Sequence, residues 1–227
     1  MNDPVSDRTL ARADIEQLLA SPGGVPWHLV DCDLEGADLS RLDLSQWTFD
    51  RCALRRTDFA GTRLEGTTWQ SCRGAFADFV AGDLTDARLV SCDFNNASFR
   101  RATLDSAAFT RCKLTGADLT EARAVALKFD ETLLIDTRLA GHSFRKARLE
   151  RIDFSQADLR KCDFRQATFS GCSLRDAQVD GARFDGADLR GADLGGLKLA
   201  DARLFRGATI SAEQAGQLLG ELGLDVR

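Results

Sequence analysis

The chain of 227 residues has no tyrosine, two histidines, one methionine and three prolines. The scarcity of histidine removes the commonest general base and metal ligand from most of the sequence. All prolines lie at the start, at Pro4, Pro22 and Pro26, so none can delete hydrogen bonds between stacked strands further on. No apolar run reaches the roughly 20 residues of a membrane helix, and no charged-then-apolar leader opens the chain. We therefore expect a cytoplasmic protein without membrane contact.

A large apolar residue occupies every fifth position from Leu29 to Leu204, with two exceptions. The 36 positions hold twenty Leu, twelve Phe, one Val and one Trp, and the exceptions are Gly74 and Ala124. An amphipathic helix repeats about every 3.6 residues and a half-buried strand about every two. Neither regular element explains a five-residue repeat, so the chain must wind in another way.

All seven cysteines lie two residues before a position of this repeat. Five of them recur at a constant interval of four repeats: Cys32, Cys52, Cys72, Cys92 and Cys112. This interval predicts a solenoid with four short sides per turn and one column of inward cysteines. Parallel thiols in a packed column indicate buried cysteines of a reducing compartment, without disulfide bonds or a metal shell.

The residues between these large side chains are also patterned. Two residues before each large position, 29 of 36 residues are Ala, Cys, Thr or Gly, as a narrow core requires. The residue between this small position and the large one is Asp thirteen times. Short polar side chains that bond nearby backbone groups favour turns. We expect a corner at every fifth residue. The predicted core also includes one column of large residues: Leu39, Phe59, Phe79, Phe99 and Leu119.

The triplets Ala37-Asp38-Leu39, Ala117-Asp118-Leu119, Ala157-Asp158-Leu159 and Ala187-Asp188-Leu189 resemble the A-(D/N)-L-x-x consensus of the pentapeptide-repeat family. The resemblance implies an all-β solenoid, a right-handed quadrilateral β-helix of about nine coils, stacked about 4.8 Å apart into a rod about 43 Å long. The register has no break. The resemblance is therefore to loop-free members, similar to fluoroquinolone-resistance and topoisomerase-poison immunity proteins.

Three regions are expected: an N-terminal helical cap over residues 1–26, the repeat region over 27–206 and a C-terminal capping helix over 207–227. A solenoid exposes apolar side chains and unpaired backbone at both ends, so it needs caps. Near the N-terminus, apolar residues from Leu10 to Leu19 have nearly helical spacing.

The C-terminal segment begins with Ser211 and Gln214 in the positions of a capping box. Apolar residues follow on one face, at Leu218, Leu219 and Leu222, and Leu224 is a further candidate for cap or dimer contacts. This helix either only caps the solenoid or also forms a homodimer interface, as family resemblance suggests.

No constellation of residues supports catalysis. His28 and His142 are separated by nearly six predicted coils, and His142 occupies an inward position where a packed histidine is expected. The repeated aspartates recur as a turn device, and no phosphate-binding loop or activated nucleophile is visible. We predict a protein that is not an enzyme and has no cofactor, metal or direct nucleic-acid contact.

Resemblance to the family implies binding of DNA gyrase or topoisomerase IV through a surface that mimics duplex DNA. The formal net charge of −5 agrees with an acidic rod that occupies a phosphate-binding saddle. However, residues 1–26 and 207–227 each carry −2, and the four sides of the coils sum to +1, +1, −2 and −1. The prediction is a protein-binding rod that protects a bacterial type II topoisomerase from a poison. The alternative is a scaffold or adaptor in a secretion or regulatory assembly.

Candidate partner contacts are irregular or acidic outward residues: Phe76, Asp83, Asp86, Asp118 and Glu121. Gly74 leaves a vacancy in the core two residues before Phe76. Phe76 either folds back into this vacancy, which we favour, or stands exposed as an anchor for a partner.

Three further irregularities have structural explanations. Leu127 at a small position is expected to replace the volume that Ala124 lacks. Trp27 and Trp47 lie one turn apart and are expected to stack at the N-terminal end of the core. Phe205 is expected to pack under the C-terminal cap.

Overall fold

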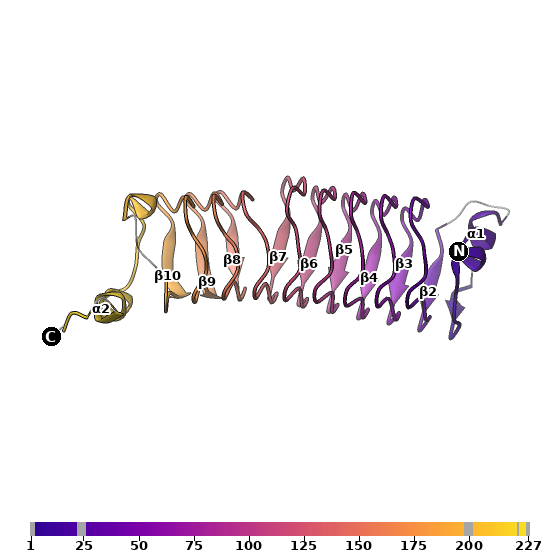
Figure 1. Cartoon of the computed structure of the whole chain (residues 1–227), viewed down its shortest axis with the longest axis horizontal. Coiled ribbons are helices and arrows are strands. Elements are labelled where there is room, and N and C mark those ends of the chain that lie inside the picture. Colours follow the sequence, from indigo (N-terminus) through magenta and orange to yellow (C-terminus); the bar gives the residue numbers. More distant parts are fainter. Residues whose placement is uncertain (1–2, 22–25, 198–201, 222, 226–227) are drawn as a thin grey trace. The chain divides into compact units, whose positions relative to one another are not determined.

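A computed structural model describes residues 3–21, 26–197, 202–221 and 223–225. The chain divides into two compact units, Met1–Lys128 and Phe129–Arg227, and each contains stacked coils of parallel β-structure (Figure 1). Parallel bridges join positions that are four repeats apart, for example Asp38 and Asp58, because the chain completes one coil in four repeats. The predicted β-solenoid with helices near both ends is therefore confirmed.

The first unit contains one short parallel strand per coil. Its elements are β1 (Val5–Ser6), α1 (Arg12–Leu19), β2 (His28–Val30), β3 (Thr48–Asp50), β4 (Thr68–Gln70), β5 (Arg88–Val90) and β6 (Ala108–Thr110). Each strand pairs with the next, from β1 to β6, as the stacked arrows of Figure 1 show. β7 (Lys128–Asp130) spans the division between the units.

The second unit repeats this arrangement over fewer coils. It contains β8 (Arg148–Glu150), β9 (Thr168–Ser173), β10 (Asp188–Asp193), the 3-10 helix η1 (Ala202–Phe205) and α2 (Ala212–Glu221). Strands β8, β9 and β10 form a parallel sheet.

We number the four sides of a coil from the side that carries the strand. In the first coil these sides centre on Leu29, Leu34, Leu39 and Leu44, and each centre has its counterpart in the next coil, as Leu29 has in Phe49. The sides without strands end in a turn. The carbonyl of the central residue accepts a hydrogen bond from the N–H three residues later, as Leu34 O does from Ala37 N, and the residue before the donor has a positive φ. Gly36, with φ +69°, is one such corner, as expected for a type II turn.

Many corners are not glycine, which costs backbone energy of the order of 1 kcal/mol each. Arg56 and Asp86, for example, have φ of 56° and 58°. Each of these residues donates its N–H to the next coil, to Ala75 O at 3.1 Å and to Asp105 O at 2.9 Å. The ladder between coils therefore holds the strained corner in place.

The repeated aspartates form the turns that their sequence pattern predicts. All thirteen accept the backbone N–H two residues later, over N···O distances of 2.8 to 3.2 Å. Asp58, for instance, accepts from Ala60 at 2.8 Å. The prediction of aspartate as a turn residue is confirmed.

The core is a set of stacked columns. The predicted column residues have no exposed surface: Leu39, Phe59, Phe79, Phe99 and Leu119. The phenylalanine rings of this column stack at centroid distances of 4.9 and 4.8 Å, close to the spacing of adjacent strands. In the second unit Phe144, Phe164 and Phe184 stack in the same way, at 5.1 and 5.0 Å.

The favoured prediction for Phe76 is wrong. A Cβ atom at Gly74 would overlap the ring of Phe94, so Phe94 of the next coil fills the vacancy. Phe76 is 50 % exposed and has φ 62° at a corner. Ala124 and Leu127 are both only partly buried, so Leu127 does not complete the predicted exchange of core volume.

The cysteines are buried free thiols. Those in the column lie at 1 % exposure: Cys32, Cys52, Cys72, Cys92 and Cys112. Their thiols donate to backbone carbonyls, as Cys72 does to Phe49 O at 3.3 Å. In the second unit burial raises the pKa of Cys162 to about 12, so this thiol stays protonated.

The N-terminal segment is more than a helical cap. β1 pairs with β2, and the Leu10 N–H donates to Asp33 O at 2.8 Å, so residues 5–10 extend the solenoid before α1 begins. The signal missed in the sequence is a five-residue step from Val5 to Leu10, which is out of register with Leu29.

Helix α1 packs through Ile15, which is fully buried, and Arg12 binds the third side at Asp38 Oδ1 over 3.2 Å. The predicted stack of Trp27 and Trp47 is wrong, because these two rings do not stack on each other. Trp47 instead packs near Phe49, and the Trp27 indole bonds to helix α1.

The C-terminal helix has the predicted capping box. Ser211 Oγ accepts from Gln214 N at 3.1 Å, and Gln214 Oε1 accepts from Ser211 N at 2.7 Å. The Gln214 amide also donates to Leu189 O and Ala192 O, both at 2.7 Å, so α2 satisfies carbonyls at the end of the coils. Leu218 is buried, Leu219 and Leu224 are exposed, and Leu222 lies outside the described residues.

The five-residue register does not persist to Leu204. Phe205 stacks on Phe184 at 4.7 Å, in the place that the repeat assigns to Leu204. The bridge from Asp188 to Thr209 is likewise one position longer than a regular bridge such as that from Asp38 to Asp58. Phe205, which is half-buried, therefore takes the inward place of the repeat at this end.

Candidate partner-binding surface

The fourth side of the first unit gathers carboxylates. We call it the acidic side, defined by its charged outward residues Asp43, Arg63, Glu65, Asp83, Asp86, Asp105 and Arg123. These five acids and two arginines give a formal charge of −3. Parallel bridges from Asp43 to Arg63, Arg63 to Asp83, Asp83 to Thr103 and Thr103 to Arg123 stack its coils.

Ion pairs neutralise only part of this side. Arg63 contacts Asp43 at 3.1 Å, and Arg123 contacts Asp105 at 2.6 Å. Among the described residues, Glu65, Asp83 and Asp86 have no ion-pair partner, and Glu65 and Asp86 are exposed. Three carboxylates on adjacent coils thus remain available to a cationic partner.

Hydrogen bonds fix the Asp83 carboxylate and the backbone at Asp86. Asp83 Oδ1 accepts the N–H and the hydroxyl of Thr85, at 3.0 and 2.6 Å. The corner at Asp86 is held by its N–H bond to Asp105 O. A carboxylate fixed in this way, as at Asp83, binds without first losing side-chain entropy, which favours recognition by a rigid partner.

The other predicted contacts lie elsewhere. Asp118 and Glu121 belong to the third side, where Asp118 Oδ1 accepts the Thr120 N–H at 2.9 Å. Phe76 occupies the corner between the second and third sides, with the Arg56 guanidinium 5.9 Å from its ring centroid. The structure therefore brings together Asp83 and Asp86 but not the remaining three. It adds Glu65 and Asp105, which the sequence reasoning missed.

The fourth side of the second unit has the opposite charge. We call it the basic side, defined by Arg145, Lys146, Asp163, Arg165, Arg183 and Asp185. Four basic and two acidic residues give a formal charge of +2. Arg165 pairs with Asp163 at 2.5 Å and Arg183 with Asp185 at 3.6 Å, whereas Arg145 and Lys146 pair with no described residue.

No cluster of three or more His, Cys, Asp or Glu side chains in the described part of the chain is arranged to bind a metal ion. His142 is buried at 7 % exposure among core residues. None of the described helices has the length and apolarity to cross a bilayer.

Sequence comparison accounts for the five-residue pattern. A family model described as "Pentapeptide repeats (8 copies)" matches residues 28–81, 137–176, 147–186 and 167–204. A second model, "Pentapeptide repeat region", matches residues 82–153. The chain belongs to the pentapeptide repeat family. No curated protein matches it in sequence.

Solved members of the family share the fold. Full-length QnrB1, a plasmid-mediated fluoroquinolone resistance protein, is 22% identical, with 87% of this chain and 100% of that chain covered at a TM-score of 0.65. HetL, involved in heterocyst differentiation regulation in the cyanobacterium Nostoc sp. strain PCC 7120, is also 22% identical, with 88% and 94% covered at a TM-score of 0.52. At these identities the likeness establishes the fold alone.

Proposed function

We propose that this protein is a protein-binding solenoid that engages a bacterial type II topoisomerase, DNA gyrase or topoisomerase IV, in the cytoplasm and protects it from a poison. The acidic side of the first unit carries the proposal, because Glu65, Asp83 and Asp86 offer unpaired carboxylates on stacked coils. A topoisomerase surface that binds DNA phosphates is basic and attracts such an array, with an affinity that falls as salt rises. The fold that it shares with QnrB1 supports the same reading.

A gyrase supercoiling assay tests this function. Purified protein, titrated to micromolar concentrations, is expected to inhibit supercoiling or to restore it in the presence of a quinolone. The variant Glu65→Lys/Asp86→Lys should lose this effect, and the matched variant Arg145→Glu/Lys146→Glu on the basic side should keep it. Absence of any effect of the native protein on gyrase and topoisomerase IV at high excess would reject the proposal.

A second candidate function is that of an adaptor between two partners of opposite charge. The observation that favours it is the basic side, where Arg145 and Lys146 form no ion pair with a described residue while the acidic side has net negative charge. Capture of one specific partner that depends on Lys146 and another that depends on Asp86, with no topoisomerase among them, would support the adaptor.

We further propose that α2 mediates a homodimer. Leu219 and Leu224 are 39% and 56% exposed, although both are large and apolar. Light scattering after size-exclusion chromatography should give twice the mass of the 24.8 kDa chain, and Leu219→Glu should give the monomer mass. A monomer for the native protein would leave α2 with the capping role alone.

A further inference from the structure

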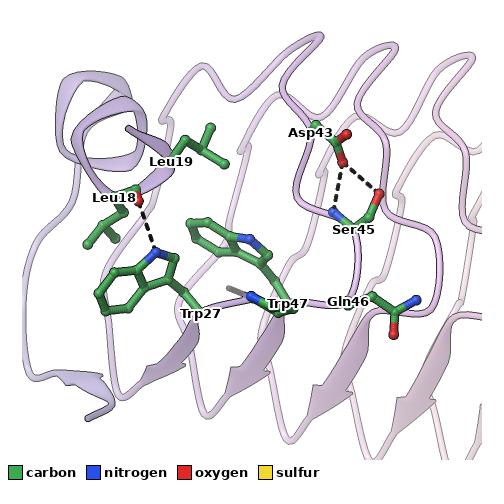
Figure 2. A pocket seen from close by; sticks show the side chains of 8 residues that line it. Leu18, Leu19, Trp27, Asp43, Ser45, Gln46 and Trp47 are labelled. Atoms are coloured by element: carbon green, nitrogen blue, oxygen red, sulfur yellow. Dashed lines mark hydrogen bonds between the residues drawn. The ribbon is translucent and has the colours of Figure 1, made fainter. Parts of the chain in front are cut away.

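A pocket of about 410 Å³ lies between helix α1 and the first coils of the first unit (Figure 2). Leu18 and Leu19 line it from the helix, and Trp27 and Trp47 line it from the coils. Asp43 stands at the opposite edge. The volume falls in the range of small-molecule sites, about 300 to 1,000 Å³.

The pocket contains a hydrogen-bond donor that the protein does not satisfy. The Trp27 indole donates to Leu18 O at 3.0 Å, and the Trp69 indole donates to Thr67 Oγ1 at 2.9 Å. Trp47 is only 2 % exposed, yet its indole N–H has no acceptor among the described residues. Among the described residues only Asp50 Oδ1 is a fully buried side-chain nitrogen or oxygen atom without a partner, so the Trp47 N–H is open to the pocket and can donate to a ligand there.

The residues that line the pocket favour a planar, apolar ligand. Trp27 and Trp47 line the pocket from the coils, and Leu18 and Leu19 line it from helix α1 (Figure 2). Pro26 adds a further apolar surface. Aromatic rings pack with favourable offset or edge contacts against indoles, which gives a planar ligand both area and orientation.

Charge at the edge of the pocket selects against anions. The Ser45 hydroxyl donates to Asp43 Oδ1 at 2.6 Å. This bond, together with the Ser45 backbone N–H and the nearby Arg63, holds the pKa of Asp43 below its ordinary value. Asp43 is therefore a carboxylate at neutral pH, and no Lys or Arg is among the described residues that line the pocket. Arg63 offsets part of this charge from outside the pocket.

We propose that this pocket binds a planar heteroaromatic molecule, neutral or cationic, that accepts a hydrogen bond from the Trp47 indole. The ring lies against the two indoles, and a cationic substituent is oriented toward Asp43. Cation attraction to a tryptophan face adds to the preference for positive charge. This site is separate from the partner contacts proposed above, although Asp43 also begins the acidic side.

Indole resonances in a ¹H–¹⁵N spectrum of the full chain test the proposal with three probes that share one ring. These probes are 1-methylnicotinamide, nicotinamide and nicotinate, which are cationic, neutral and anionic. The Trp47 resonance should shift saturably with the first two, with Kd values of the order of 1 mM for ligands of this size. The cation should bind at least about fivefold more tightly than the anion, as expected for a partly exposed charge pair.

Two variants separate recognition from folding. Trp47→Phe removes the donor but keeps an aromatic ring, and should weaken nicotinamide binding about tenfold while the Trp27 and Trp69 resonances stay in place. Asp43→Asn keeps the turn acceptor and should abolish the preference for the cation, whereas Asp58→Asn, at an equivalent turn on the third side, should not. The proposal is overturned if no probe shifts Trp47 saturably, or if Asp43→Asn leaves the charge preference intact.

Discussion

The fourth sides of the two units have the same backbone and opposite charge. In both, a parallel bridge joins adjacent coils, as Asp83 does to Arg63 and Asp163 to Arg183. In both, an aspartate at this bridge position accepts the N–H two residues on. Yet the outward residues sum to −3 on the acidic side and +2 on the basic side. The repeat therefore dictates the shape of the surface but leaves its chemistry free.

The inward positions of the two units, in contrast, are alike in chemistry. Phe79 in the first unit and Phe164 in the second each stack between phenylalanines one coil away. Both are fully buried. The phenylalanine stack lies on the third side in the first unit and on the fourth side in the second, but both units bury large apolar residues. Differences in recognition must therefore arise from the outward residues.

The largest expected effect tests the equivalence of the two cores. Phe79→Ala and Phe164→Ala should each lower the free energy of unfolding by about 3 to 5 kcal/mol, because each removes a buried ring from a stack. Phe76→Ala, at an exposed corner, should change it by less than about 0.5 kcal/mol. Chemical denaturation measures all three. A large loss for only one of the two buried rings would break the comparison.

A smaller effect on stability distinguishes the turn at Asp83 from the turn at Asp163. Asp83→Ala should cost about 1 kcal/mol through the lost turn hydrogen bonds. Asp163→Ala should cost more, because Asp163 also binds the Arg165 guanidinium at 2.8 and 2.5 Å. Asp83→Asn keeps an acceptor oxygen and serves as the control. Thermal unfolding measures these differences. A lower melting temperature for Asp83→Asn than for Asp83→Ala would contradict a turn role for this carboxylate.

The smallest effect concerns pH. Hydrogen bonding to Arg190 lowers the pKa of Asp188 to about 2, and hydrogen bonding to Ser45 lowers the pKa of Asp43. Both pKa values are lowered in the folded state, so each carboxylate stabilises the fold at pH values above its unfolded pKa of about 3.9. This stabilisation is lost as the pH falls through the pKa of the folded state.

Titration of the carboxyl carbons by NMR measures these pKa values directly. Added salt should raise the pKa of Asp188 more than that of Asp43, since an exposed ion pair is screened and a hydroxyl hydrogen bond is not. Equal salt responses would remove this difference between the units.

The sequence predicts the core because the repeat concerns residues that have only one environment available. A leucine or phenylalanine at every fifth position must be inward, and aspartate before it must meet the turn N–H. The regular cysteine spacing also predicts four sides per coil. These inferences depend on local geometry repeated many times, so single exceptions do not disturb them.

Predictions at irregular positions fail because the alternatives differ by packing between coils. The sequence does not reveal that Phe94 reaches the space at Gly74, which leaves Phe76 exposed. The carboxylates of Glu65 and Asp105 were missed for another reason. Charge summed along each whole side cancels the acidic side against the basic side, and the division into two units is visible only in the structure.

The central claim, that the acidic side of the first unit binds a topoisomerase, is tested most directly by the salt dependence of gyrase affinity. Binding of the native chain to immobilised gyrase should weaken steeply as salt rises. Glu65→Gln/Asp86→Asn should reduce both the affinity, by about tenfold or 1.4 kcal/mol, and the steepness of the salt dependence. Arg145→Gln/Lys146→Gln should change neither. Equal effects of the two double variants, or binding that is independent of salt, would contradict the account.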